Sequence, residues 1–382
     1  MDFSVTEEQQ RRRAEIVRFA QDELNEGVGE RDATQAFSRK LWTRCQQVHL
    51  LGLFVPKDFG GGELDALSTI MAMEAFGYGC HDSGLVFSIG AHLFSCVVPI
   101  WKHGTADQKR RYLPGLCSGE VIGGNATTEA EAGSDVFSMA TSARPNGAGF
   151  VVSGRKVFVS NGPVADVLVV SAVTDEKKRS FGGITSFIIE TAAPGVRRST
   201  AHAKMGLRTS PLGDVEFENC EVAVENRLGQ TGAGATIFSE FMAWERIGIS
   251  AAHLGTMERL LETTIARARK RVQFGQPIGK FQAIGHAIVD VKRRLEAARL
   301  LVYRAAWLLD QNKPSLIDAA LAKLSVSESF VRAAETAIRV FGGSGYLTET
   351  GVERSLRDAM ASPIYSGTSD IQRNIIARSL GL

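Results

Sequence analysis

The chain has 382 residues, which is the length of two or three domains of ordinary size. Hydrophobic residues make up 44% and charged residues 23%, a balance that excludes a disordered or collagen-like chain. Lysine and arginine total 44 against 42 for aspartate and glutamate, so the formal net charge of +2 provides no basic field that would point to nucleic acid.

The N-terminus and the cysteines indicate the compartment. Residues 1–8 are polar and acidic and lack the apolar core of a secretory signal. No apolar run reaches the roughly 18 residues that a membrane span needs. The five cysteines are odd in number, widely spaced and without a C-x-x-C pair, which disfavours a disulfide framework or a zinc site. We therefore expect a cytoplasmic protein with buried, inert thiols and no membrane contact.

The chain divides into three stretches of different pattern. Residues 1–120 carry apolar residues at helical spacing, opened by a capping box of Ser4 and Glu7. Residues 121–230 hold short β-branched runs separated by turns without helices, which favours an antiparallel barrel or sandwich. Residues 231–382 return to helical patterns with short connections, which predicts a four-helix bundle. The expected helices of this last stretch are 235–273, 279–310, 315–342 and 367–380.

Common cofactor and hydrolase motifs are absent from the sequence. There is no P-loop, no G-x-G-x-x-G between a strand and a helix, no H-E-x-x-H and no G-x-S-x-G. A Rossmann nicotinamide site is disfavoured, and the scattered histidines disfavour a metal site. What remains is four clusters rich in glycine, serine, threonine and arginine, each of which alone is typical of a turn or cap. They are 127–135, 156–162, 271–278, and 341–346 taken with 365–372.

In this order the four clusters resemble the acyl-CoA dehydrogenase family of flavoproteins, and the resemblance covers essentially the whole chain. It implies an α+β multidomain fold: an N-terminal all-helical domain (1–120), a central antiparallel β-barrel domain (121–230) and a C-terminal four-helix bundle (231–382), with FAD between them. It also implies an oxidoreductase that acts on a CH–CH or CH–NH group of an acyl thioester. In the family a carboxylate takes the proton at Cα, a hydride leaves Cβ for the flavin, and hydrogen-bond donors polarise the thioester carbonyl.

The resemblance assigns nine residues to FAD. They are Thr128, Ser134, Phe158, Ser160, Arg271, Phe274, Arg339, Gly343 and Thr368. Thr128 and Ser160 are expected to hydrogen-bond the flavin ring system, Phe158 to pack on its face, and Ser134 to lie where flavin and thioester meet. Many relatives have tryptophan where this chain has Phe158 and threonine where it has Ser160.

The other assigned residues belong to the far end of the cofactor. Arg271 and Phe274 are expected to contact the pyrophosphate and adenosine of FAD bound to a neighbouring subunit, and Gly343 to let the backbone approach that adenosine. Thr368 is expected to contact the diphosphate at a helix start. Arg339 stands at a cofactor-contacting position where the family often has glutamine. The alternative for either phenylalanine alone is plain core packing.

One position departs from the family in its chemistry. The family usually carries its catalytic glutamate where this chain has Ser366, whose hydroxyl cannot act as a base without an activator. Some branches place the base in the long helix after the β domain, as a glutamate followed by arginine, and this chain has Glu245 and Arg246 there. We expect Glu245 to be the base, Ser366 to offer its backbone N–H to the thioester carbonyl, and Arg246 and Ser134 to contact substrate. The alternative is that Glu245 only pairs with a cation on its own helix.

The resemblance that indicates the substrate depends on fewer residues. Residues 244–246 with 366–370, and the segments 91–96 and 376–382, are similar to the branch that oxidises prolyl thioesters on peptidyl carrier proteins to pyrrolyl thioesters in secondary metabolism. The alternatives are a short- or branched-chain acyl-CoA dehydrogenase and a non-redox flavin-bound assembly subunit. The resemblance further implies a homotetramer or homodimer, and an electron acceptor that is either an electron-transfer flavoprotein or dioxygen. We expect no metal and no nucleic-acid partner.

Overall fold

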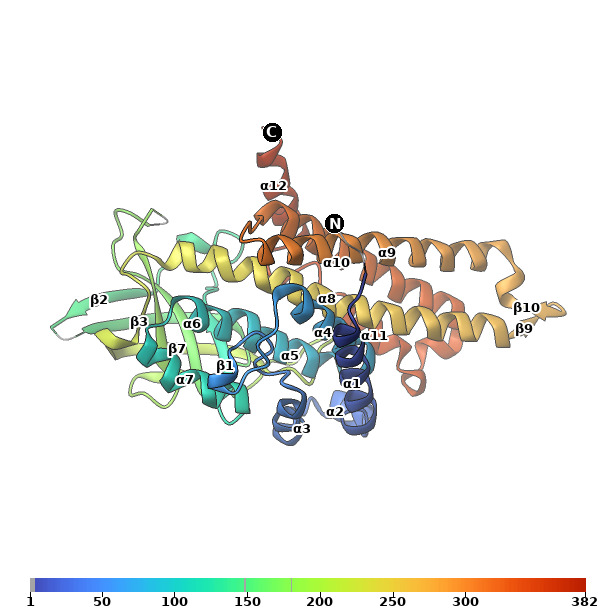
Figure 1. The fold of residues 1–382 in the computed structure, drawn as a ribbon, viewed down its shortest axis with the longest axis horizontal. Helices are drawn as coiled ribbons and strands as arrows, with labels where there is room; N and C mark the ends of the chain where they lie inside the picture. The colour runs from blue at the N-terminus through green and yellow to red at the C-terminus, as the bar shows by residue number, and fades with distance from the viewer. Residues whose placement is uncertain (1–3, 148, 180) are drawn as a thin grey trace.

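The computed structural model describes residues 4–147, 149–179 and 181–382 (Figure 1). The helices are α1 (Glu7–Glu23), α2 (Val28–Thr34), α3 (Arg39–Arg44), α4 (Ala66–Gly79), α5 (Ser83–His92), α6 (Val98–His103), α7 (Ala106–Ser118), α8 (Gly234–Lys270), α9 (Gln282–Asp310), α10 (Leu316–Phe341), α11 (Val352–Ala359) and α12 (Ser369–Ser379). The strands are β1 (Gly123–Ala126), β2 (Ser142–Asn146), β3 (Gly149–Ser160), β4 (Val167–Val173), β5 (Ile184–Glu190), β6 (Val196–Arg198), β7 (Leu212–Ala223), β8 (Arg227–Leu228), β9 (Val272–Gln273) and β10 (Gln276–Pro277). The predicted order of a helical part, a central β part and a second helical part is confirmed.

The first helix starts later than the sequence pattern predicted. Its capping box is formed by Thr6, whose hydroxyl accepts from the Gln9 N–H, and by the Gln9 side chain, which accepts from the Thr6 N–H. The predicted box of Ser4 and Glu7 is wrong, because α1 begins only at Glu7. The reciprocal bonding is the same, shifted along the chain by two residues.

The central sheet is mixed, although most of its pairings are antiparallel. Its strand order is β6-β7-β3-β2-β4-β5-β8, with β1 beside β4. Two pairings, β1 with β4 and β2 with β4, are parallel, which the expectation of an antiparallel domain did not include. Parallel neighbours need a long crossover, and the β2–β3 hairpin supplies it between β1 and β4. Every residue of β4 is buried, so this strand lies at the centre of the β part.

The 37-residue helix α8 joins the sheet to the C-terminal helices (Figure 1). It packs against α4 so closely that glycine is required at the crossing. A Cβ at Gly77 would lie 1.9 Å from the Ala252 carbonyl oxygen, and one at Gly255 would lie 1.9 Å from the Glu74 carbonyl oxygen. The predicted bundle helices correspond to α8, α9, α10 and α12; the short helix α11 was not predicted.

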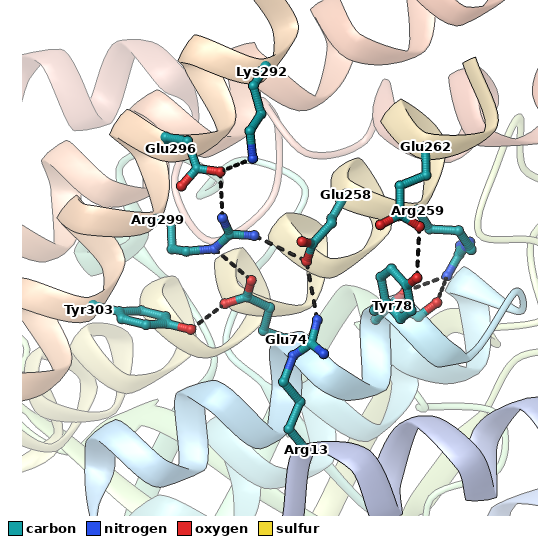
Figure 2. A network of polar contacts seen from close by, with 11 residues as sticks. Arg13, Glu74, Tyr78, Glu258, Arg259, Glu262, Lys292, Glu296, Arg299 and Tyr303 are labelled. Carbon is teal, nitrogen blue, oxygen red and sulfur yellow. Dashed lines mark hydrogen bonds and ion pairs between the residues drawn. The ribbon is translucent and has the colours of Figure 1, made fainter. Parts of the chain in front are cut away.

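A polar network ties α1, α4, α8 and α9 together (Figure 2). Arg299 of α9 donates to Glu74 over 2.8 Å and to Glu258 over 3.2 Å, and Arg13 reaches the same Glu258 over 3.4 Å. The Tyr303 hydroxyl donates to the other carboxylate oxygen of Glu74 over 2.8 Å. Burial raises the pKa of Glu74, while Arg299 and Tyr303 act against that rise. The network fixes the N-terminal helices to the bundle that carries the site below.

One helical stretch is long and apolar enough to cross a membrane by length and composition. Among the described residues this stretch is Ser83–His103; its most apolar 18-residue window has a mean hydropathy of 1.7, and 89% of that window is buried inside the protein. Ser88, His92 and Ser95 interrupt the stretch, so it holds no uninterrupted apolar run of about 18 residues, which is why the sequence analysis did not single it out. Burial of the stretch among other helices accounts for its composition. All five cysteines are buried, as the sequence predicted.

Candidate active site

The two predicted catalytic residues meet in space. Glu245 lies in α8 and Ser366 in the turn before α12, and the Ser366 hydroxyl donates to Glu245 Oε1 over 2.5 Å. Burial raises the pKa of Glu245, whereas the Ser366 hydrogen bond and the positive charges of Arg246 and Lys323 lower it. Among the residues that the structure describes, Glu245 forms no ion pair with a lysine, arginine or histidine. The arrangement therefore favours a carboxylate held by a hydroxyl over one paired with a cation on its own helix.

The turn that carries Ser366 is held by side chains from three directions. Ser366 has a φ of +54° and Gly367 a φ of +82°, both in the left-handed region. The Ser366 carbonyl accepts from Arg246 over 3.4 Å and from Gln372 over 3.2 Å. The Gly367 carbonyl accepts from Gln372 over 2.7 Å and from Lys323 over 2.8 Å. These donors offset the cost of an unfavourable backbone conformation and aim the Ser366 side chain at the carboxylate.

The residue before Ser366 is fixed as well. Tyr365 shares a hydrogen bond with His253 Nε2 of α8, and its ring lies 4.7 Å from that of Phe87 in α5. His253 stacks on Phe330 of α10 with ring centroids 4.8 Å apart. Burial lowers the pKa of His253 to about 3, so the imidazole is neutral. Sequence reasoning missed His253 and Lys323, for which a polar residue on an apolar helix face was the available signal, and it gave Tyr365, inside the 365–372 cluster, no role of its own.

Aromatic rings pack together around Trp244, the residue that precedes Glu245 in α8. Trp244 lies 5.3 Å from Phe54 and 6.0 Å from Trp101 between ring centroids. Phe94, in a π-helical stretch (Leu93–Val97), packs against α8 where Gly248 leaves room: a Cβ there would lie 2.2 Å from its ring. These apolar surroundings exclude water from one side of α8, which favours the neutral form of nearby carboxyl groups.

The β part gathers three of the residues assigned to the flavin. The Val157 N–H donates to the Thr128 carbonyl over 2.9 Å, which joins the 127–135 loop to β3. The Lys156 ammonium, fully buried, donates to Glu129 over 2.8 Å and reinforces this join. A register shift of β3 against β7 follows Lys156, and there Phe158 takes a φ of +55° with its ring 64% exposed. Ser160 closes the same strand.

The remaining assigned residues are spread over the chain. Arg271 and Phe274 lie at the β9–β10 hairpin, at the opposite end of α8 from the sheet (Figure 1), and Phe274 is 95% exposed. Arg339 is exposed on α10, and Ser134 is exposed in the 127–135 loop. A Cβ at Gly343 would meet nothing within 4 Å. The structure therefore leaves these positions open to solvent, and it places Arg271 and Phe274 away from the sheet.

The residues present fit FAD. Exposed aromatic rings at Phe158 and Phe274 offer faces for its two ring systems, and the N-terminus of α12 offers N–H groups to its diphosphate. The Thr368 hydroxyl caps that helix by accepting from the Ile371 N–H over 3.1 Å. Beside it, the Ser369 hydroxyl and the side-chain amide oxygen Oε1 of Gln372 are buried without a hydrogen-bond partner. Unsatisfied buried polar atoms at a helix start are expected where a polar ligand completes the site.

Comparison with known families decides the classification. Residues 6–120 match the acyl-CoA dehydrogenase N-terminal domain, residues 124–220 the middle domain and residues 232–381 the C-terminal domain. The chain belongs to the acyl-CoA dehydrogenase family. It is an FAD-dependent dehydrogenase of an acyl thioester, as the sequence predicted.

Several similar proteins indicate a narrower group within this family. An L-prolyl-(peptidyl-carrier protein) dehydrogenase of Pseudomonas fluorescens is 44% identical over 100% of both chains. The solved structure of the prolyl acyl carrier protein oxidase AnaB has a TM-score of 0.97 at 43% identity, covering 99% of this chain and 100% of AnaB. That of PigA with FAD and proline has a TM-score of 0.98 at 39% identity over 100% of both chains. The predicted resemblance to the prolyl-carrier-protein branch is confirmed.

Proposed function

We propose that this acyl-CoA dehydrogenase family member oxidises an L-prolyl thioester on a peptidyl carrier protein, with Glu245 as the base. Two successive two-electron oxidations would give the pyrrolyl thioester. The likeness to a prolyl-carrier-protein dehydrogenase and to AnaB and PigA supports the substrate. The observation that carries the mechanism is the contact between Glu245 and the hydroxyl of Ser366, at the place where the family usually has its glutamate.

The chain's own groups would divide the work as follows. FAD, when bound, would supply the acceptor for the hydride lost from Cβ. Glu245 takes the proton from Cα, and its raised pKa brings a carboxylate closer to the basicity that this step needs. The Ser366 hydroxyl holds one carboxylate oxygen, which leaves the other free for the substrate proton. The Ser366 backbone N–H would polarise the thioester carbonyl, and the burial that raises the pKa of Glu245 would limit the water around it.

Assembly and redox partners follow as part of the same proposal. We place Arg271, Phe274 and Gly343 against FAD of a neighbouring subunit, in a homotetramer or homodimer. The 95% exposure of the Phe274 ring is consistent with cover by a second copy. An electron-transfer flavoprotein or dioxygen would reoxidise the flavin. We place the enzyme in the cytoplasm, where the buried thiols stay reduced.

The test of the base is Glu245→Gln in the FAD-loaded protein. The variant should bind FAD and fold, yet fail to bleach the oxidised flavin band when mixed with prolyl-loaded carrier protein without oxygen. Glu240→Gln is the matched control, since Glu240 lies on the same helix and pairs with His103 over 3.0 Å. The control should bleach at the wild-type rate. Bleaching by Glu245→Gln at that rate would refute the assignment, and a wild-type protein that no thioester bleaches would favour a non-redox role.

A further inference from the structure

A buried lysine lies near the proposed base without an ion-pair partner. The Lys323 side chain is 2% exposed. Burial and the positive charge of Arg246 lower its pKa to about 8. Within residues 4–147, 149–179 and 181–382, no carboxylate lies within the 4.0 Å that defines an ion pair with it. Burying an ammonium group without a direct counter-charge is costly, so its position calls for a role other than stabilising the fold.

The ammonium group fastens the turn that carries Ser366. Lys323 Nζ donates to the Gly367 carbonyl oxygen over 2.8 Å. One helical turn along α10, Ser327 donates to the Ser362 carbonyl over 3.0 Å, and the Ser362 hydroxyl donates back to the Ser327 carbonyl over 3.2 Å. Residues four apart share a helix face, so one face of α10 holds the segment at both ends. Of the two α10 residues that hold the segment, Lys323 and Ser327, only Lys323 is charged.

The ionic surroundings of Glu245 are two cations. Among the described residues, Arg246, Lys323 and Ser366 act on Glu245 directly. Behind them, Glu328 of α10 acts on Lys323, and Asp358 of α11 acts on Tyr365, which shares a hydrogen bond with His253. His253 is neutral because burial lowers its pKa to about 3, and burial raises the pKa of Tyr365. Arg246 and Lys323 therefore supply the positive charge that favours the ionised carboxylate against burial.

We propose that Lys323 is a positioning residue for the dehydrogenation. Its ammonium group holds the Gly367 carbonyl so that the Ser366 hydroxyl meets Glu245, and its charge favours the ionised form of that base. The inference rests on the proposed function, in which Glu245 removes the Cα proton. It assigns two linked tasks to one side chain: a geometric one through the turn and an electrostatic one across the site.

The test is the pH dependence of anaerobic flavin bleaching by prolyl-loaded carrier protein, with Lys323→Met, Lys323→Gln and Lys323→Arg. Loss of the positive charge makes the carboxylate harder to ionise. The acid limb of the profile should therefore move up by about one pH unit in the Met and Gln variants. At pH values below the acid limb, these variants should therefore bleach the flavin about tenfold more slowly than the wild type. Gln keeps a donor for the Gly367 carbonyl, so only Met should also lower the plateau, and Arg should leave the acid limb in place.

Lys204→Met is the matched control. Lys204 is another ammonium group that donates to main-chain carbonyls, those of Leu207 and Ser210, and burial lowers its pKa to about 8. Its loss should leave the acid limb where it is. The FAD content and the thermal midpoint of each variant show whether it folds. If Lys323→Met does not fold, Lys323→Gln alone tests the effect of the charge.

The outcomes separate this inference from the proposed function. An acid limb that stays at its wild-type pH in the charge-free Lys323 variants overturns the role of Lys323, provided that Glu245→Gln is inactive. A fully active Glu245→Gln removes the proposed base, and the role of Lys323 falls with it. A limb that moves equally in the Lys323→Arg variant would show that shape alone, not charge, acts on Glu245, and would also overturn the proposal.

Discussion

Replacing Ser366 by alanine is predicted to move the acid limb of the flavin-bleaching profile to higher pH. The Ser366 hydroxyl donates to Glu245 over 2.5 Å, and this bond favours the ionised carboxylate. A hydrogen bond to a charged group contributes about 1.5–3 kcal/mol, and about 1.4 kcal/mol corresponds to one pH unit. Its loss should therefore shift the limb upward by about one to two pH units.

Ser366→Gly is the second variant in this experiment. Ser366 has a φ of +54°, which glycine adopts without strain, so this variant loses the hydroxyl while relieving the backbone. Anaerobic mixing with prolyl-loaded carrier protein across a pH series should give the same shift for both variants. If both lower the plateau rate and leave the limb unmoved, the hydroxyl does not hold the carboxylate and the reasoning is refuted.

Two further predictions concern the frame around the site. Arg299→Met should lower the free energy of unfolding by about 3 kcal/mol, because Glu74 is left buried without its cation. Arg304→Met is the control: Arg304 lies on the same helix but is half-exposed, so the free energy of unfolding should change by less than about 1 kcal/mol. Without Arg299 the Glu74 pKa rises further above its unfolded value, so the loss in thermal midpoint should grow as the pH rises above the ordinary range of a glutamate; a pH-independent loss would contradict this. Gly77→Ala should lower the thermal midpoint by forcing α4 and α8 apart, since its Cβ would lie 1.9 Å from a carbonyl oxygen of α8. Gly29→Ala, whose Cβ meets nothing within 4 Å, should leave the midpoint unchanged or slightly higher, and equal midpoints for the two alanine variants would contradict the packing argument.

The parts of the fold that the sequence predicted are those with local signals. Helical spacing over 235–273 corresponds to α8, and β-branched runs correspond to β4 and β5, because these patterns depend on near neighbours. The parallel placement of β1 beside β4 was not predicted, since strand order depends on contacts across more than 40 residues. Phe158 was assigned to the flavin by resemblance alone. Its exposed position at a register shift of β3 against β7 depends on strand pairing and could not be predicted from the local sequence.

The site shows the same division. Ser366 was singled out because it stands where the family usually has its catalytic glutamate, and Glu245 because it can replace that glutamate as the base. The hydrogen bond between them, which joins positions 121 residues apart, could not be predicted from the sequence. Lys323 and His253 carry no motif and lie on long helices where a polar residue is usually a solvated one. Only the packing of α8 against α10 turns them into neighbours of the turn before α12.

The most direct test of the central claim is a comparison of substrates in the FAD-loaded protein without oxygen. Prolyl-loaded carrier protein is mixed with one sample and a panel of short and branched acyl-CoA thioesters with others, and the oxidised flavin band is followed. We predict rapid bleaching by the prolyl-loaded carrier protein and none by the acyl-CoA panel. Bleaching by an acyl-CoA alone would contradict the carrier-protein claim and make the enzyme an acyl-CoA dehydrogenase of the short- or branched-chain kind.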